Sequence, residues 1–266
     1  MAAAPAPLNG SSAWASRYAT ELRGIITQHA SRAPRSVQQF LGPSELGSAC
    51  DRQVAGKMAG SSHTNHISDP WPSIVGTAIH AWLADCFAGD NQRTGILRWI
   101  AEQRVTPHPD HPGTADLYDA HERAVVDHKC LGTTTMSKLR AHGPSRKYLI
   151  QLLLYGHGYR QLGLPVDRVV LAAYPRTAST LDGMYVWDRP HTAEDDLIVD
   201  AVLAQTKIRY QYATALRERQ IRLLDIPASP SDDECFYCPF YRPEADGRTD
   251  GCPGTVGNRT ILGKAA

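Results

Sequence analysis

The sequence predicts an α/β protein with a small mixed β-sheet flanked by helices. Segments with helical periodicity lie on both sides of the central region, and short segments with strand patterns lie within it. A strongly apolar helix divides those strands into a group of three and a group of two. Such an alternating order is typical of an α/β core. With 266 residues and 42% hydrophobic composition, the chain is long enough to bury one substantial core.

The N-terminal part is predicted to hold helices joined by a loop. Residues 1–11 are rich in Ala and Pro and are expected to be disordered, whereas residues 12–31 have a helical pattern. Ser44 is the expected N-cap of a brief helix that carries Cys50. Residues 60–73 are rich in Gly, Ser, His and Pro, which predicts a loop.

The central part supplies the predicted core. Its expected elements are a helix at 73–88 ended by Gly89, strands at 99–105, 114–118 and 124–130, a helix at 148–162, strands at 168–174 and 184–187, and a helix opened by a Thr192–Asp195 capping box that ends near Gln220. The patterns predict four regions: the N-terminus at 1–11, a helical segment at 12–72, the core at 73–226, and a cysteine-rich segment with a tail at 227–266.

Charge and hydropathy narrow the function classes. The formal net charge is +1, so DNA binding would have to come from local basic patches and bound metal. No stretch has the roughly 18 consecutive apolar residues of a membrane span, and the start lacks the pattern of a secretory signal. A cytoplasmic protein that uses no membrane is therefore expected. Structural disulfides are rare in that compartment, so the six cysteines need metal or burial as an explanation.

The segment Val125-Val126-Asp127-His128-Lys129 is the centre of the predicted site. In a strand, Asp127 and Lys129 share one face and His128 points to the other. Asp116 lies in the preceding strand, and a hairpin can bring it beside Asp127, which gives two carboxylates for Mg²⁺ or Mn²⁺. Such an ion assists phosphodiester hydrolysis, and a nearby Lys stabilises the transition state. The alternative is a solvated salt bridge on an edge strand.

Four further polar residues flank this segment. Glu102, one strand earlier, is a candidate for a further acid. His80 lies on a predicted helix, where the choice is between a metal ligand and a capping or surface residue. Gln151 and Tyr155 are four residues apart on a predicted helix and therefore share a face. Ordinary helix-surface polarity is the alternative for this last pair.

The order of these groups resembles the motif series of RecB-like nucleases in the PD-(D/E)XK superfamily. The resemblance covers about residues 70–160 and consists of Gly76-x3-His80, Gly113-x2-Asp116, Asp127-His128-Lys129 and Gln151-x3-Tyr155. It implies a restriction-endonuclease-like core and a metal-dependent DNA exonuclease acting on single-stranded or resected ends. Such proteins work in recombination, repair or CRISPR-type adaptation, with proteins of those processes as partners, and also occur in phage genomes.

The resemblance also implies a role for each residue. Metal binding is assigned to His80, Asp116, Asp127 and the backbone carbonyl of His128. Catalysis is assigned to Asp116, Asp127 and Lys129. Gln151 and Tyr155 are expected either to contact DNA or to position Lys129. Two rival functions stay open from the sequence. One is a non-catalytic DNA-end-binding subunit that keeps the nuclease fold, and the other is a zinc-stapled protein that is not an enzyme.

Cys235-x2-Cys238-x13-Cys252 forms a C-terminal cluster. A C-x2-C pair is typical of a metal site, because its two thiolates can bind one ion or cluster. Cys50 is the candidate fourth ligand, with a small buried hydrophobe as its alternative. One Cys before the nuclease motifs and three after them resembles the branch that includes the AddB nuclease domain and the Cas-four-type exonucleases, which implies a 4Fe–4S cluster tying the two ends together.

Two points keep that metal assignment open. The gap from Cys238 to Cys252 is longer than is usual in that branch, and zinc accepts four thiolates equally well. Cys86 continues an apolar helix stripe and Cys130 ends a strand, so both are expected to be buried and inert.

Basic residues follow the predicted catalytic strand. They are Lys138, Arg140, Arg146 and Lys147, of which the last three are the candidate DNA contacts. The choice for this group is between a path for DNA phosphates and a solvated loop.

Overall fold

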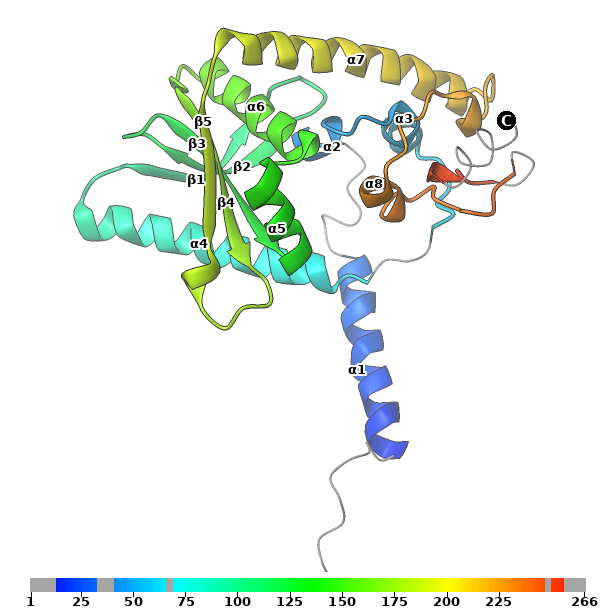
Figure 1. The fold of residues 1–266 in the computed structure, drawn as a ribbon, viewed down its shortest axis with the longest axis horizontal. Coiled ribbons are helices and arrows are strands. Elements are labelled where there is room, and N and C mark those ends of the chain that lie inside the picture. The colour runs from blue at the N-terminus through cyan, green and yellow to red at the C-terminus, as the bar shows by residue number, and fades with distance from the viewer. Residues whose placement is uncertain (1–12, 33–40, 66–68, 247–249, 256–266) are drawn as a thin grey trace, which may run out of the picture. The chain divides into compact units, whose positions relative to one another are not determined.

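The computed structural model describes the chain except for residues 1–12, 33–40, 66–68, 247–249 and 256–266 (Figure 1). The chain divides into two compact units, one formed by Met1–Gln38 and Asp69–Ile74 and the other by Gln39–Ser68 and Val75–Ala266. The described helix α1 (Ala13–Ser31) of the first unit agrees with the helix predicted at 12–31. The predicted disorder of residues 1–11 lies outside the described residues.

The second unit is built on a five-stranded sheet whose strands lie in chain order (Figure 1). The strands are β1 (Trp99–Val105), β2 (Gly113–Asp119), β3 (Ala124–Leu131), β4 (Arg168–Pro175) and β5 (Tyr185–Pro190). β3 and β4 run parallel, and the other neighbouring pairs are antiparallel. This mixed sheet with flanking helices confirms the predicted fold class, and all five predicted strands are present.

Helices that follow β3 cover one face of the sheet and make the crossover that a parallel pair requires. They are α5 (Thr133–His142) and α6 (Arg146–Gln161). α6 begins at its N-cap Ser145, whose hydroxyl accepts from the Tyr148 N–H, and its apolar run is fully buried against the strands. α7 (Ala193–Arg217) packs on α6 and opens with the predicted Thr192–Asp195 capping box.

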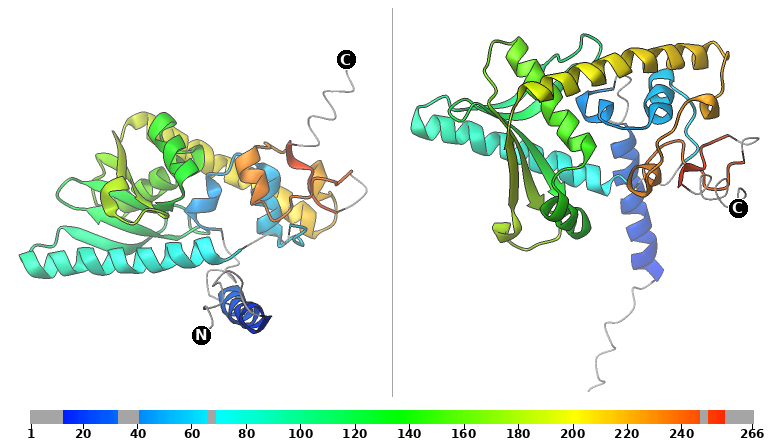
Figure 2. Two further views of the ribbon diagram at one scale, coloured as in Figure 1. Left: turned by 60° about the horizontal axis from the view of Figure 1, so that its bottom comes forward. Right: turned by 45° about the horizontal axis from the view of Figure 1, so that its top comes forward.

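From Val75 onward, α4 (Trp71–Thr94) lies along the opposite face of the sheet (Figure 2). Phe87 stacks on His128 of β3 with ring centroids 5.6 Å apart, and its ring lies 4.9 Å from that of Trp99 in β1. Asn91 donates to the Trp99 carbonyl at 2.7 Å. The central strands are therefore enclosed between helices on both sides, which removes water from their side chains.

The N- and C-terminal segments of the second unit meet beside α7. They comprise α2 (Pro43–Leu46), α3 (Asp51–Ala59), the short 3-10 helix η2 (Leu223–Asp225) and α8 (Asp232–Phe236). The buried guanidinium of Arg209 pairs with Asp51 at 2.8 Å and donates to the carbonyls of Leu46 and Ser48. Arg52 donates to the carbonyls of Leu224 and Ile226, so charged hydrogen bonds hold the two segments together.

Several helix boundaries differ from the prediction. The N-cap of α2 is Gly42 and not Ser44, because Pro43 already occupies the first helical position. Cys50 does not lie inside that helix; it caps α3, which the sequence analysis missed. α4 continues past Gly89 to Thr94 and ends where Gly95 adopts a positive φ of 68°. Among the described residues, no helix is both long and apolar enough to cross a membrane.

Candidate active site and cysteine site

The predicted site lies at a fork between β2 and β3. The two strands pair only as far as Leu117 and Val126, and the next residues in register are Asp116 and Asp127. Beyond this point β3 stays paired with β4 and β2 stays paired with β1, so the sheet opens between β2 and β3. The backbone N–H of His128 donates to the Asp116 carboxylate at 2.7 Å instead of to a strand carbonyl. The fork thus places two acids side by side.

Asp127 and Lys129 form a buried ion pair on the α6 side of β3. Their charged atoms are 2.5 Å apart, and Asp127 has no solvent exposure. Burial raises the pKa of the Asp127 carboxyl to about 6, against the opposing effect of Lys129. Burial also opposes the charge on Lys129, but Asp127 and Asp116 outweigh it and raise the pKa of the ammonium. Lys129 therefore stays positively charged, with its amine 5.2 Å from the Tyr148 ring centroid.

α4 brings an imidazole to the same fork. His80 Nδ1 lies 3.3 Å from Asp116 Oδ1, and this hydrogen bond raises the pKa of His80. Burial would raise the pKa of Asp116, but the bond from His80 and the charge of Lys129 outweigh it and lower that pKa. Ligand atoms of His80, Glu102 and Asp116 all lie within 4.8 Å of one another. These three residues have the composition and closeness of a metal-binding group.

Glu102 reaches this group through a distorted strand. It lies opposite Asp116 in the register, but these two residues are not paired in the β1–β2 ladder. The residues on either side of them keep their pairing. The φ of Glu102 is 52°, a left-handed conformation that costs a non-glycine residue on the order of 1 kcal/mol or more. Glu102 was predicted as a further acid, and its position opposite Asp116 in the register places it on the same face of the sheet as Asp116.

The His128 side chain lies on the other face of β3, toward α4. Phe87 stacks on it, and the Tyr174 hydroxyl is 3.3 Å from its Nδ1. Burial lowers the pKa of His128 to about 4, so the imidazole is neutral near pH 7. The backbone carbonyl of His128, between the two charged residues of the strand, is the part of this residue that remains beside Asp127.

Gln151 and Tyr155 lie beneath the fork on α6. The Gln151 amide donates to the Tyr155 hydroxyl at 3.4 Å, and both side chains are buried, with exposed fractions of 6% and 5%. Gly113 at the start of β2 packs directly over Tyr155, because a Cβ at Gly113 would lie 3.0 Å from the tyrosine ring. This burial leaves the pair little surface for DNA and favours a positioning role.

The candidate DNA contacts occupy different surroundings. Arg140 on α5 donates to the Gly183 carbonyl at 2.8 Å, and Arg146 donates to the Gly47 carbonyl at 2.6 Å. Lys147 is half-buried: burial lowers the pKa of its amine, and Lys57 and, more weakly, Lys129 lower it further. The positive charges of Lys147 and of Lys129 on β3 therefore repel each other.

One basic residue near the site escaped the sequence analysis. Arg176 follows the end of β4, and its guanidinium donates to the Cys130 carbonyl at 2.7 Å. The Tyr148 ring that contacts Lys129 has its pKa raised by burial, while Lys129 and Arg176 oppose the rise. Because carboxyl ends of parallel strands share one edge, the position of Arg176 after β4 was a signal that could have placed it beside the end of β3.

The four cysteines Cys50, Cys235, Cys238 and Cys252 lie where the two terminal segments meet. Burial raises the pKa of Cys235 and of Cys238, and the neighbouring thiols of Cys50 and Cys252 raise both further. Arg52 donates to Cys252 Sγ at 3.0 Å. The four residues predicted as ligands therefore lie in one region of the second unit, where Cys238 and Cys252 pack with Phe240, and a shared ligand stays a prediction.

The predictions for the two remaining cysteines have different outcomes. Cys130 is buried, with 8% of its surface exposed, as the sequence predicts. The prediction for Cys86 is wrong, because that residue is exposed. Phe87, the chain neighbour of Cys86, turns toward the sheet and stacks on His128, whereas Cys86 stays accessible to solvent.

Several solved structures are similar to this chain, including three exonuclease structures, and no family model and no curated protein matches it. An alkaline exonuclease (LHK-Exo) from Laribacter hongkongensis is 14% identical, with 67% of this chain and 97% of that chain covered and a TM-score of 0.39. The same enzyme in complex with dAMP is 14% identical over 69% and 95%, with a TM-score of 0.42. A phage-related exonuclease from Haemophilus somnus 129PT is 10% identical over 64% and 82%, with a TM-score of 0.45.

Proposed function

We propose that this protein is a metal-dependent DNA exonuclease that acts on single-stranded or resected ends. The fork between β2 and β3 is the observation that carries the proposal. It brings Asp116 of β2 beside Asp127 of β3, and Lys129 lies on the same strand as Asp127. α4 adds His80 at hydrogen-bond distance. The expectation of DNA as substrate and of digestion from an end comes from the resemblance to RecB-like nucleases.

The donor set fits a divalent cation. Asp127 Oδ1 is buried and has no hydrogen-bond partner among the described residues, which is costly unless a cation satisfies it. Ligand atoms of His80, Glu102 and Asp116 already lie within 4.8 Å of one another. Asp127 and the carbonyl of His128, on the facing strand, would complete the ligands of the ion. Oxygen ligands with one imidazole suit Mg²⁺ or Mn²⁺. A bound ion supplies Lewis-acid stabilisation of phosphate charge and a more acidic water.

The chain's own residues supply the remaining catalytic features. The Lys129 ammonium stays charged in a site with little water, where it stabilises the negative charge that develops on a phosphodiester. Gln151 and Tyr155 are hydrogen-bonded to each other on α6, and the resemblance assigns them the positioning of Lys129. Lys147, Arg146 and Arg140 contribute contacts to phosphates along the strand, which makes binding salt-dependent.

We also propose that Cys50, Cys235, Cys238 and Cys252 hold a 4Fe–4S cluster. Cys238 and Cys252 pack together around Phe240 where the two terminal segments meet, and four thiolates are the donor set that such a cluster requires. The cluster would act as a staple between α3 and the C-terminal segment. A zinc ion bound by the same thiols is the chemical alternative, and metal analysis of the purified protein separates the two.

Digestion of end-labelled DNA tests the enzyme proposal. Single- and double-stranded oligonucleotides labelled at either end are incubated with and without Mn²⁺. Wild-type protein should release mononucleotides or short products from an end only with metal, and Lys129→Met should abolish this. Lys207→Met, which removes an exposed lysine of α7, is the matched control and should keep full activity. Metal-independent binding without cleavage would instead indicate an end-binding subunit.

A further inference from the structure

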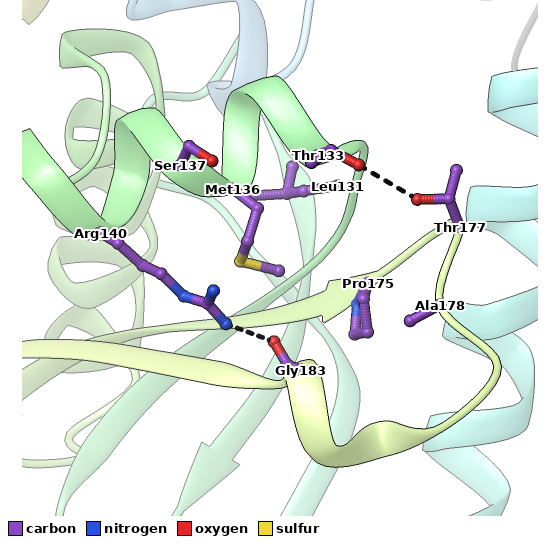
Figure 3. Close-up of a pocket in the computed structure, with 9 residues that line it drawn as sticks. All are labelled: Leu131, Thr133, Met136, Ser137, Arg140, Pro175, Thr177, Ala178 and Gly183. Carbon is purple, nitrogen blue, oxygen red and sulfur yellow. Dashed lines mark hydrogen bonds between the residues drawn. The ribbon is translucent and has the colours of Figure 1, made fainter.

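A cavity of about 220 Å³ opens at the carboxyl ends of the parallel strands β3 and β4 (Figure 3). It lies between α5 and the segment that leads from β4 into the 3-10 helix η1 (Leu181–Gly183). The cavity is lined by Leu131, Thr133, Met136, Ser137, Arg140, Pro175, Thr177, Ala178 and Gly183. None of these residues is among the candidate metal ligands, so the cavity is separate from the metal site.

The cavity begins two residues beyond Lys129 along β3. Leu131 follows Lys129 by two residues in β3, so the two side chains share a face of the sheet. A strand advances about 3.3 Å per residue, which puts the cavity wall roughly 7 Å further along the strand. That distance is of the same order as one nucleotide step of an extended single strand. Arg176, beside the end of β3, carries a positive charge between the two places.

The lining combines an apolar wall with a polar edge. Leu131, Met136, Pro175 and Ala178 supply the apolar surface, and a methionine thioether makes favourable contacts with aromatic rings. On the polar side, the hydroxyls of Thr133 and Thr177 are 3.3 Å apart, and each can donate or accept (Figure 3). A nucleobase has the matching chemistry, because its faces are apolar and its edge carries donors and acceptors.

Size also limits the occupant. The volume is below the roughly 300–1,000 Å³ typical of sites for drug-sized molecules, so the cavity suits a single ring system. Arg140 has one guanidinium nitrogen fixed by the Gly183 carbonyl, which holds its planar head at the rim. Hydroxyls that both donate and accept do not select one base, so all four bases should be accepted.

We propose that this cavity is a nucleobase subsite that holds the base of the nucleotide next to the scissile phosphate. The inference rests on the proposed nuclease function, because the phosphate of that nucleotide would lie toward Lys129. Its consequence is that a base at this position strengthens binding and speeds cleavage, whereas an abasic residue at the same position does neither.

Two phenylalanine substitutions make a matched pair for the test. Ala178 is exposed and lines the cavity, so Ala178→Phe should fill the cavity without disturbing the core. Ser179, the next residue, is equally exposed and does not line it, so Ser179→Phe is the control. Thr177→Val removes one polar-edge hydroxyl with almost no change of shape and serves as a second, milder variant.

Binding is measured by NMR of protein labelled at its methionine methyl groups. Thymidine 5′-monophosphate should shift the Met136 signal and leave that of Met58 on α3 unchanged, and it should bind about tenfold more tightly than 2-deoxyribose 5-phosphate. Ala178→Phe should remove this preference and Ser179→Phe should keep it. Equal affinity for the two ligands in wild-type protein, or an unmoved Met136 signal, would overturn the inference.

Cleavage gives the second readout. Wild-type protein should digest an oligonucleotide more slowly through a single abasic position, and Ala178→Phe should digest the intact and abasic strands at similar rates. A protein that binds thymidine 5′-monophosphate at Met136 but cleaves no DNA would refute the nuclease proposal and keep the base subsite. Metal-dependent cleavage with no base preference in either readout would refute the subsite and keep the nuclease.

Discussion

Asp127 is fully buried and Lys129 is half-buried, and the loss of hydration acts on them differently. It raises the pKa of Asp127, whereas for the pKa of Lys129 the two nearby carboxylates outweigh it. Asp127 Oδ1 stays without a partner among the described residues, and Asp116 is turned toward His80. Such an arrangement costs stability in the absence of a ligand. A divalent cation between the carboxylates would relieve that cost, so at this scale the fork is better suited to binding than to stability.

Substitutions at the ion pair should separate metal binding from catalysis. Asp127→Asn removes a charged ligand and should weaken Mn²⁺ binding, measured by calorimetry, together with cleavage. Lys129→Met removes no proposed ligand, so it should keep Mn²⁺ binding while cleavage falls on the order of 100-fold or more. A Lys129→Met protein that cleaves at the wild-type rate would exclude a catalytic role for this amine.

The raised pKa of Asp127 predicts a pH dependence of metal stabilisation. Its pKa is about 6 in the fold against an ordinary 3.8, so the folded state binds the proton more tightly and this group lowers stability as pH rises between those values. Metal binding requires the ionised form. Mn²⁺ should therefore raise Tm clearly at about pH 7.5, by the equivalent of about 2.7 kcal/mol at a hundredfold excess over Kd, and little at about pH 5.

Asp127→Asn is the control for this pH effect, and it should show little change in Tm with Mn²⁺ at either pH. An equal rise in Tm at both pH values would show that Mn²⁺ binds elsewhere on the chain.

At the residue scale, strand alternation was enough to find the pair. Asp127 and Lys129 lie on the α6 side and the His128 ring on the α4 side, as a period of two requires. The distortion of β1 at Glu102 was not readable, because a left-handed φ of 52° at a non-glycine residue leaves no local pattern in the sequence. Arg176 was missed because its closeness to β3 arises from parallel pairing across a long crossover.

Among the elements, α5 shows how packing overrides local preference. Its start is a run of three threonines at 133–135, which are weak helix formers, and the sequence analysis left this segment unassigned. Met136 and Leu139 of α5 are buried in the main core, and that burial stabilises the helix. α4 likewise continues through Gly89, where nothing lies near the missing side chain and a glycine alone is tolerated.

The contact between α3 and the C-terminal segment predicts a sensitive glycine. A Cβ at Gly56 would lie 2.6 Å from the buried Phe240 ring and 2.8 Å from Leu223. Gly56→Ala should therefore destabilise the protein by roughly 1–3 kcal/mol in denaturant unfolding and loosen the cysteine site. Gly76→Ala on α4 meets nothing within 4 Å and should be neutral or stabilising by up to about 1 kcal/mol. A neutral Gly56→Ala would contradict the close packing of the two segments.

For the whole molecule, the main result is how the ends of the second unit are joined. Arg52 and Arg209 connect α3 to the C-terminal segment and to α7 with charged hydrogen bonds, and the four thiols lie in the same region. A shared ligand for the four distant cysteines stays a prediction. The sequence predicted the five strands and their order along the chain. It did not predict the division into two units, because that depends on contacts no local pattern reports. The predicted boundaries at residues 72 and 226 remain predictions.

The metal content of the protein tests whether a cluster joins α3 to the C-terminal segment. Protein purified without oxygen should contain about four iron atoms per chain and absorb broadly in the visible range. Cys252→Ser should lose the iron and lower Tm, whereas Cys86→Ser, at an exposed thiol outside the cluster, should change neither. One zinc per chain and no colour would replace the iron–sulfur proposal with a zinc site held by the same thiols.

Anomalous diffraction from crystals soaked in Mn²⁺ tests the central claim most directly, because it locates the ion without relying on activity. The geometry predicts a peak at the fork between β2 and β3, touching carboxylate oxygens of Asp116 and Asp127. His80 and the carbonyl of His128 should complete the contacts. A peak only at other sites, or an empty fork at saturating Mn²⁺, would contradict the claim that these residues form a metal-dependent nuclease centre.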